Sequence, residues 1–258
     1  MYRRAISTLG CGSLSLEQAG ALALRHGLDG LELRALGGTL DLPAWLGNRY
    51  GTPAGAAAGA LPGRMPVLAL GTSFKLAGAT EAERTELLRF VPWAEALGAK
   101  YLRVFDGGQA RYDAGETAAA VATLAWWRAL RASRGWAVDL MVETHDSLLT
   151  SGQILRFADA AAGVAVLWDA HHTWLKGREN PVETWGAIGR HVVHIHVKDS
   201  LAGTYVLPGN GQFPMAPLRE RLAAEFPGVV SLEWERWWHP VLPPLEEALV
   251  TAARRSWW

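Results

Sequence analysis

Short apolar runs alternate with longer segments of helical periodicity along the whole chain. Runs of this kind, bounded by turn residues, are typical of buried strands, and the longer segments repeat apolar residues at helical spacing. We predict strands over residues 4–11, 30–34, 67–73, 101–106, 138–145, 164–169, 192–198 and 229–235.

Capping residues indicate where several of the intervening helices begin. Ser15 with Gln18, and Thr80 with Glu83, each match the pattern of a capping box. The segment 41–63 is rich in Gly, Ala and Pro, so we expect its helix to have loose ends. We predict helices over residues 15–27, 41–63, 80–98, 116–132, 151–163, 216–226 and 244–254, and a short helix from Pro181.

The pattern gives eight strand–helix pairs in succession. Strands separated by helices pair in parallel through crossovers, and eight such units at this length predict a closed (β/α)8 TIM barrel. We expect one domain over residues 1–258, because no repeat or linker interrupts the chain. A doubly wound open sheet is the alternative, but Gly10-Cys11-Gly12 lacks the third glycine of its phosphate-binding turn.

Composition narrows the function classes. The chain has 258 residues, half of them apolar, which excludes intrinsic disorder. Its 25 basic and 25 acidic residues balance, so we expect neither nucleic acid nor a membrane surface as a partner. With one cysteine and no signal-peptide pattern at the N-terminus, we expect a cytoplasmic protein. Among 13 tryptophans, Trp257 and Trp258 would favour a subunit contact if exposed, so a homo-oligomer stays open.

Candidate chemistry lies at the strand ends. In (β/α)8 barrels the active site is at the carboxyl ends of the strands. Glu143 and Asp169 end the fifth and sixth predicted strands. The seventh carries His194 and His196, and the eighth carries Glu233 and Glu235. Four consecutive strands thus each offer a metal-ligand type at one end.

We predict that these residues bind one divalent cation. Carboxylate oxygens with one imidazole suit Mn²⁺ first, with Mg²⁺, Co²⁺ or Zn²⁺ as alternatives. His194 and His196 share a face, and His196 is nearer the strand end, so His196 is the expected ligand and His194 lies deeper. Depth alone does not separate Glu233 from Glu235.

Five phrases, taken in this order, resemble the xylose-isomerase-like barrel superfamily of sugar isomerases and epimerases with a single divalent-metal site. They are His26-Gly-Leu-Asp-Gly-Leu-Glu-Leu-Arg34, Met141-Val-Glu-Thr-His-Asp146, Leu167-Trp-Asp-Ala-His-His172, His194-Ile-His-Val-Lys-Asp199 and Ser231-Leu-Glu-Trp-Glu235. The resemblance covers nearly the whole chain.

The resemblance to the ketose 3-epimerases implies metal ligands at Glu143, Asp169, His196 and Glu233, which favours Glu233 over Glu235. It also implies that His172, three residues after the aspartate, binds substrate. The chain departs from those epimerases after the seventh strand, where Lys198-Asp199 replaces a Gly-Glu pair and a substrate-contacting arginine. The epimerase substrate therefore does not transfer to this chain.

The ligand set predicts a metal-dependent isomerase or epimerase of carbohydrate metabolism. The ion would chelate a carbonyl and an adjacent hydroxyl and stabilise the enediolate formed when the α-proton leaves. Glu143 and Glu233 are the predicted catalytic bases, one for each face of the substrate. His172, His145, Lys198 and Arg103 are candidate contacts for substrate oxygens, although Lys198 and Arg103 could equally form structural ion pairs.

Three other functions remain open at this point. A dehydratase of the same superfamily, of the keto-inositol type, would remove water through a similar enediolate. An endonuclease acting on abasic DNA would need more His ligands and a basic surface, which the balanced charge does not favour. A non-enzymatic barrel that binds a metal or a sugar is the third.

Overall fold

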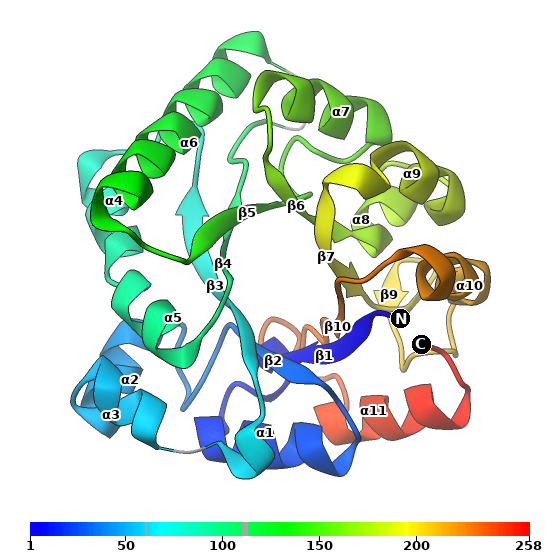
Figure 1. The fold of residues 1–258 in the computed structure, drawn as a ribbon. Coiled ribbons are helices and arrows are strands. Elements are labelled where there is room, and N and C mark those ends of the chain that lie inside the picture. The colour runs from blue at the N-terminus through cyan, green and yellow to red at the C-terminus, as the bar shows by residue number, and fades with distance from the viewer. Residues whose placement is uncertain (60, 110–112) are drawn as a thin grey trace.

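Parallel strands close into a barrel in the computed structural model, which describes residues 1–59, 61–109 and 113–258. The order around the barrel is β1-β10-β7-β6-β5-β4-β3-β2, so strands pair in chain order and the last closes on the first (Figure 1). The predicted (β/α)8 TIM barrel is therefore confirmed. The strands are β1 (Arg3–Ser7), β2 (Gly30–Leu33), β3 (Val67–Lys75), β4 (Tyr101–Phe105), β5 (Asp139–Glu143), β6 (Ala165–Asp169), β7 (Val192–Val197) and β10 (Val229–Leu232).

Helices surround the barrel as an outer ring (Figure 1). Strand residues that point outward, such as Leu140 and Val142 on β5, pack in the main apolar core with this ring. The helices are α1 (Leu16–Arg25), α2 (Leu42–Tyr50), α3 (Pro53–Ala58), α4 (Glu81–Leu88), α5 (Val91–Leu97), α6 (Ala114–Arg134), α7 (Ser151–Ala160), α8 (Ala170–Leu175), α9 (Pro181–Ile188), α10 (Met215–Glu225) and α11 (Leu245–Arg254), with 3-10 turns η1 (Thr8–Cys11), η2 (Pro62–Arg64) and η3 (Gly189–His191).

Two predicted helices are each divided in the structure. The 41–63 segment forms α2, α3 and η2, because Gly51 ends α2 at a φ of 74° and Thr52 starts a new cap by accepting a hydrogen bond from Gly55 N. Residue 60 of that segment lies outside the described residues. The 80–98 segment forms α4 and α5, with Pro92 in the first turn of α5.

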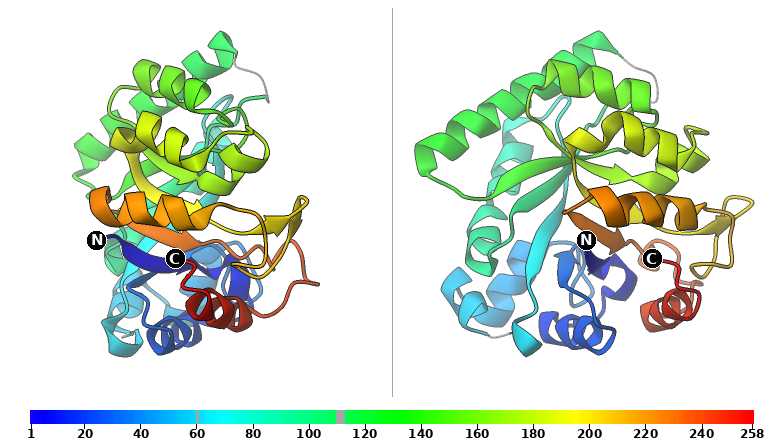
Figure 2. Two further views of the ribbon diagram at one scale, coloured as in Figure 1. Left: turned by 90° about the vertical axis from the view of Figure 1, so that its right-hand side faces the viewer. Right: turned by 45° about the vertical axis from the view of Figure 1, so that its right-hand side comes forward.

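Some predicted strands are shorter, and three elements were not predicted. The run over 4–11 leaves the sheet after Ser7 and continues as η1. Helix α8 directly follows β6, and the connection after β7 contains a small antiparallel hairpin of β8 (Ser200–Leu201) and β9 (Thr204–Tyr205). The hairpin and the loop after β10 project from the barrel at the end opposite the N-terminus (Figure 2).

On β5 and β6 the inward-facing side chains change from apolar to charged over two residues. Ala69, Met141 and Leu167 pack together inside the barrel as a small apolar cluster. Because side chains alternate along a strand, the next inward positions on β5 and β6 are Glu143 and Asp169. On β5 and β6 the apolar cluster therefore lies beneath the charged side chains, whereas Glu32 on β2 and His194 on β7 are level with Ala69 and Leu167.

The C-terminal tryptophan pair does not form an exposed patch. Trp257 is buried, with its ring centroid 6.3 Å from that of Phe213, and Trp258 is only partly exposed. The basis for a subunit contact at these two residues is therefore removed. Among the described residues, no helix has both the length and the apolar character needed to cross a membrane.

Asp199 organises the connection that carries the hairpin. Its buried carboxylate accepts hydrogen bonds from the backbone N–H groups of Ser200, Gly209, Gly211 and Phe213 at 2.8–3.1 Å. A Cβ atom on Gly211 would lie 2.2 Å from Asp199 Oδ1, so only glycine allows this approach. One side chain thus fixes the position of the loop next to the barrel mouth.

Asp199→Ala is expected to lower the free energy of unfolding by about 3 kcal/mol, because it leaves several buried N–H groups without an acceptor. Denaturant titration measures this loss. Glu220→Ala, at an exposed position on α10, is the control and should change stability by less than about 0.5 kcal/mol. Equal stability of the two variants would show that Asp199 does not hold the loop.

Candidate metal centre

The four side chains predicted as metal ligands meet at the carboxyl end of the barrel. Glu143 and Asp169 are the last residues of β5 and β6, His196 lies on β7, and Glu233 directly follows β10. Each is at most 5% exposed. One potential ligand atom from each residue lies within 4.8 Å of the others. The structure therefore brings the whole predicted set together.

The donor set fits a divalent cation. In the part of the chain that the structure describes, Asp169 Oδ2 and His196 Nδ1 are buried and make no hydrogen bond, and Asp169 Oδ2 has an ion pair with Lys198. Buried polar atoms without hydrogen bonds are costly, and a cation held among them would remove that cost. The atoms that could hold the ion are Asp169 Oδ2, His196 Nδ1 and one oxygen from each of the Glu143 and Glu233 carboxylates.

Helix α8 explains how Asp169 presents one oxygen to this cluster. Asp169 is the N-cap of α8, and its Oδ1 accepts the backbone N–H of His172 at 2.9 Å. The other oxygen, Oδ2, is left to face the cluster. The short sequence Asp-Ala-His-His thus caps a helix and positions a ligand with the same carboxylate.

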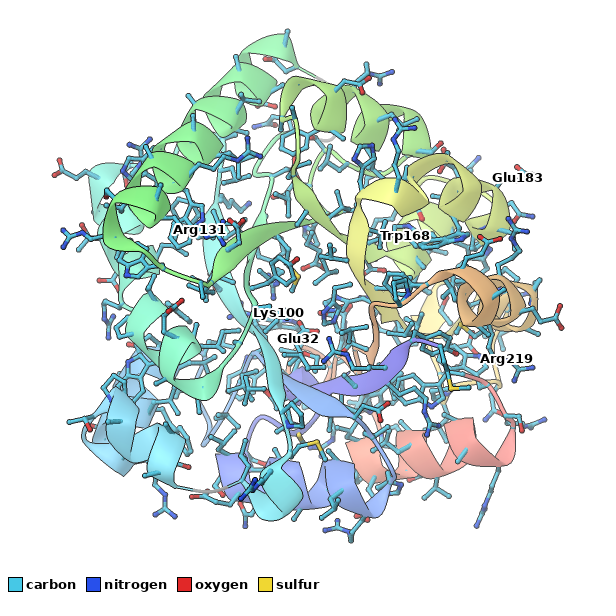
Figure 3. All side chains as sticks on the ribbon, in the orientation of Figure 1. Glu32, Lys100, Arg131, Trp168, Glu183 and Arg219 are labelled. Carbon is cyan, nitrogen blue, oxygen red and sulfur yellow. The ribbon has the colours of Figure 1, made fainter. Side chains whose placement is uncertain are left out.

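Glu32 on β2 is a site residue that the sequence analysis missed. Its Oε2 lies 2.8 Å from His196 Nε2 and 3.0 Å from His194 Nε2. Burial alone raises the pKa of Glu32, but the charges and hydrogen bonds of the two histidines outweigh it and hold that pKa well below its usual range. Figure 3 shows Glu32 inside the ring of strands. The available signal was a lone carboxylate in an otherwise apolar strand.

The Glu32 contact determines which nitrogen of His196 faces the cluster. With Nε2 directed to Glu32, Nδ1 is directed to Glu143 Oε1 at 3.6 Å and to Glu233 Oε2 at 3.3 Å. A ring that donates from one nitrogen presents a lone pair at the other. His194 contacts Glu32 and lies outside the four-residue cluster, as its greater depth predicted.

Lys198 lies among carboxylates and is 1% exposed. Its Nζ is 2.8 Å from Asp169 Oδ2 and 2.5 Å from both Glu233 Oε2 and Glu235 Oε1. Burial alone lowers the pKa of Lys198, but the three carboxylates outweigh it and raise that pKa well above its usual value. The structure thus places Lys198 in an ion-pair network and not on the wall of the cavity described below.

Arg103 forms an ion pair within the site. Its Nε lies 3.1 Å from Glu143 Oε2, and its Nη1 donates a hydrogen bond to the Thr72 carbonyl at 3.1 Å. It also lines the cavity that opens above the cluster. The ion pair orients the Glu143 carboxylate from the side away from His196.

His172 and His145 lie side by side at the wall of the same cavity, with ring centroids 5.1 Å apart. His172 Nδ1 is 3.2 Å from Asp169 Oδ2, and burial lowers the pKa of His172 to about 3, so the ring is neutral. The hydrogen bond that the Asp146 carboxylate accepts from His145 Nδ1 raises the pKa of His145. Both residues therefore adjoin the cluster without belonging to the four-residue set.

The cavity has a volume of about 190 Å³, below the range of roughly 300–1,000 Å³ for drug-sized ligands. Glu143 and Glu233 reach it from the cluster. Other lining residues were not predicted as site residues, most of all Arg34 from β2 and Tyr205 from the hairpin. The full lining is Leu9, Arg34, Arg103, Phe105, Glu143, His145, His172, Lys176, Tyr205, Glu233, Glu235 and Trp238.

Solved structures with the same fold cover nearly the whole chain. The probable 3-DHS dehydratase AsbF of Bacillus anthracis is 15% identical, with a TM-score of 0.78 over 98% of this chain and 99% of that one. The IOLI protein with a bound zinc atom is 20% identical, with a TM-score of 0.74 over 98% and 96%. The 3-keto-D-glucoside 4-epimerase YcjR of E. coli is 15% identical, with a TM-score of 0.73 over 99% of each chain.

These likenesses extend to the fold, and their reactions differ from one another. No curated protein matches the chain in sequence. A family described as xylose isomerase-like TIM barrel matches residues 21–256, a span that contains every residue of the cluster and most of the barrel. The chain therefore belongs to the xylose isomerase-like TIM barrel family.

Proposed function

We propose that the chain is a divalent-metal-dependent isomerase or epimerase that moves the proton next to the carbonyl of a sugar-like ketose. The observation that carries this proposal is the buried set of Glu143, Asp169, His196 and Glu233 at the base of a small cavity. The oxygen-rich donors favour Mn²⁺, with Mg²⁺ and Co²⁺ next. The zinc atom bound by the IOLI protein keeps Zn²⁺ among the candidates.

The positions of the two glutamates support a reaction with two bases. β5 and β10 flank β6 and β7, so Glu143 and Glu233 enter the cluster from its two outer strands. A divalent ion at the cluster would supply positive charge that stabilises the substrate oxygens as the α-proton leaves. Glu143, oriented by Arg103, would take a proton from one side, and Glu233 would return one from the other.

Lys198 and His172 have supporting roles in this proposal. The Lys198 ammonium, 2.5 Å from Glu233 Oε2, would balance the charge of Glu233 and hold its carboxylate in place. His172 is held by the first turn of α8 and is neutral, so it can donate or accept a hydrogen bond with a substrate hydroxyl. His145 lies next to it with a partly exposed ring and would contact the same end of the substrate.

A dehydratase is the second candidate, and His145 is the observation that favours it. Loss of water after α-proton removal needs an acid for the departing hydroxyl, and the His145 ring lines the cavity with its pKa raised by its hydrogen bond to Asp146. The two candidates share the first step and differ in the product. NMR of the reaction with a ketose or a keto-inositol distinguishes an inverted or isomerised sugar from an unsaturated product.

Mn²⁺ is expected to bind with one ion per chain, measured by isothermal titration calorimetry. Asp169→Asn should weaken binding by about 100-fold or more, because it removes a charged ligand, and Glu32→Gln by about 10- to 100-fold, because His196 loses its orienting acceptor. Asp159→Asn, at an exposed position on α7, is the control. Unchanged Mn²⁺ affinity in a folded Asp169→Asn variant would place the ion elsewhere.

Glu143→Gln and Glu233→Gln should each lower turnover by at least about 100-fold, the usual contribution of a general base. Both should still bind Mn²⁺, since the other ligands remain. In D₂O, one of the two variants is expected to exchange the α-proton without inverting the product, because a single base serves one face. Glu220→Gln should behave as wild type. Normal turnover by both variants with Mn²⁺ bound would assign the proton transfers to other residues.

His172→Ala should raise KM or lower kcat while changing Mn²⁺ affinity by less than about tenfold, since the ring contacts Asp169 Oδ2 but is not a proposed ligand. Steady-state kinetics and calorimetry on the same preparation test both parts. Loss of Mn²⁺ binding in this variant would identify His172 as a ligand.

A further inference from the structure

Among the described residues, two cations that line the cavity, Arg34 and Lys176, have no carboxylate at ion-pairing distance, and of the two only Arg34 is buried. Arg34, just past the end of β2, is 5% exposed and lines the cavity. Its guanidinium donates one side-chain hydrogen bond, from Nη2 to Ser73 Oγ at 2.8 Å, although such a group has five N–H donors. In the described part of the chain, no carboxylate comes within ion-pairing distance of it. Its charge is therefore left to face the cavity.

The backbone is built to hold Arg34 beside a second arginine. A Cβ atom on Gly71 would lie 2.8 Å from Arg34 Cδ and 3.0 Å from Arg103 Nη2, so the missing side chain of Gly71 makes room for both. Arg34 N also donates a hydrogen bond to Thr8 Oγ1 at 2.8 Å, which fixes the start of the side chain. Two guanidinium groups thus share one part of the wall.

The two arginines differ in how their charges are balanced. Arg103 is paired with Glu143, whereas Glu143, Glu233 and Glu32 act on Arg34 only from beyond ion-pairing distance. Burial, together with the charge of Arg103, lowers the pKa of Arg34 to about 9, so Arg34 is still protonated at neutral pH. A buried guanidinium next to another cation is stabilised when an anion binds it.

We propose that Arg34 binds a carboxylate carried by the substrate, so that the substrate class is an acidic sugar or related keto acid and not a neutral ketose. A carboxylate accepts two parallel N–H bonds from one guanidinium. The cavity of about 190 Å³ favours this small planar group over a phosphate ester. The inference rests on the proposed function, which identifies the cavity as the substrate site, and it specifies in addition that the substrate is an anion.

The test is a binding comparison with Mn²⁺-loaded protein. The probes are a ketohexose, the same ketohexose oxidised to a carboxylate at the carbon furthest from its carbonyl, the amide of that acid, and the corresponding phosphate ester. The acid should bind about tenfold or more tightly than the ketohexose or the amide, the scale of one charged hydrogen-bonded pair. Trp238 lines the cavity, so quenching of its fluorescence by a bound ligand is a second measure of binding.

Variants separate Arg34 from the metal. Arg34→Met should lower the ratio of acid affinity to amide affinity to about one, and Arg34→Lys should retain part of the preference. Arg49→Met, at an exposed arginine on α2, is the control and should match wild type. Thermal unfolding of each variant checks that it is folded, and the comparison of acid with amide in wild type needs no variant at all.

Three outcomes would overturn the inference. Equal affinity of wild type for acid and amide would show that no anion site exists. A preference that survives Arg34→Met but disappears when the metal is removed would assign the carboxylate to the metal cluster. Tighter binding of the phosphate ester than of the acid would make phosphate the recognised group.

The same data separate this inference from the proposed function. Arg34-dependent binding of the acid without exchange of any α-proton would retain the anion site and reject the isomerase. Exchange of the α-proton of neutral ketoses, with no preference for the acid in binding, would retain the isomerase and reject the anion site.

Discussion

Charge buried at one end of the barrel is the constraint on which the rest of this structure depends. Glu32, Glu143, Asp169 and Glu233 are almost completely removed from solvent. An isolated buried carboxylate would cost several kcal/mol, so each must have a partner of opposite charge or a set of donors. Lys198 provides part of that compensation, and a divalent cation would complete it. The buried carboxylates therefore destabilise the fold unless their partners are brought close to them.

Strand register brings the charged side chains of the barrel to the same level. Asp169 on β6 is level with His196 on β7, and His196 is level with Ser231 on β10, two positions before Glu233. Inward positions recur every second residue, so ligand-type side chains from adjacent strands arrive at similar depth. The apolar cluster of Ala69, Met141 and Leu167 lies below Glu143 and Asp169.

The pair Lys198-Asp199 shows how a departure from the related epimerases is used in this chain. Lys198 points into the carboxylates and balances their charge. The Asp199 carboxylate accepts hydrogen bonds from backbone N–H groups of the following loop. This loop places Tyr205 at the cavity wall. Tyr205 in turn donates a hydrogen bond to Glu235 at 3.0 Å, so the loop and the ion-pair network are joined. Lys198 thus balances the charge of the site, and its neighbour Asp199 fixes the loop that carries Tyr205.

The sequence by itself determined the barrel and the four clustered residues. Strand and helix periodicity are local properties, and the carboxyl ends of parallel strands meet at one edge, so Glu143, Asp169 and His196 could be brought together with Glu233 or Glu235 without coordinates. The family resemblance then favoured Glu233. The division of the 41–63 and 80–98 helices was missed because a turn at Gly51 or ahead of Pro92 interrupts an otherwise continuous helical pattern.

Only the tertiary structure decided the contributions of β2. Glu32 reaches His196 across 164 residues of sequence, and Arg34 reaches the cavity beside Arg103, because closure of the barrel brings β2 round to face the other strands. The lone carboxylate of Glu32 in an apolar strand was a local signal, but the sequence does not show that Glu32 and Arg34 point into the barrel or which side chains they meet there. Whether such a charge is paired, as for Glu32, or left facing a cavity, as for Arg34, depends on which side chains the closed barrel places opposite it.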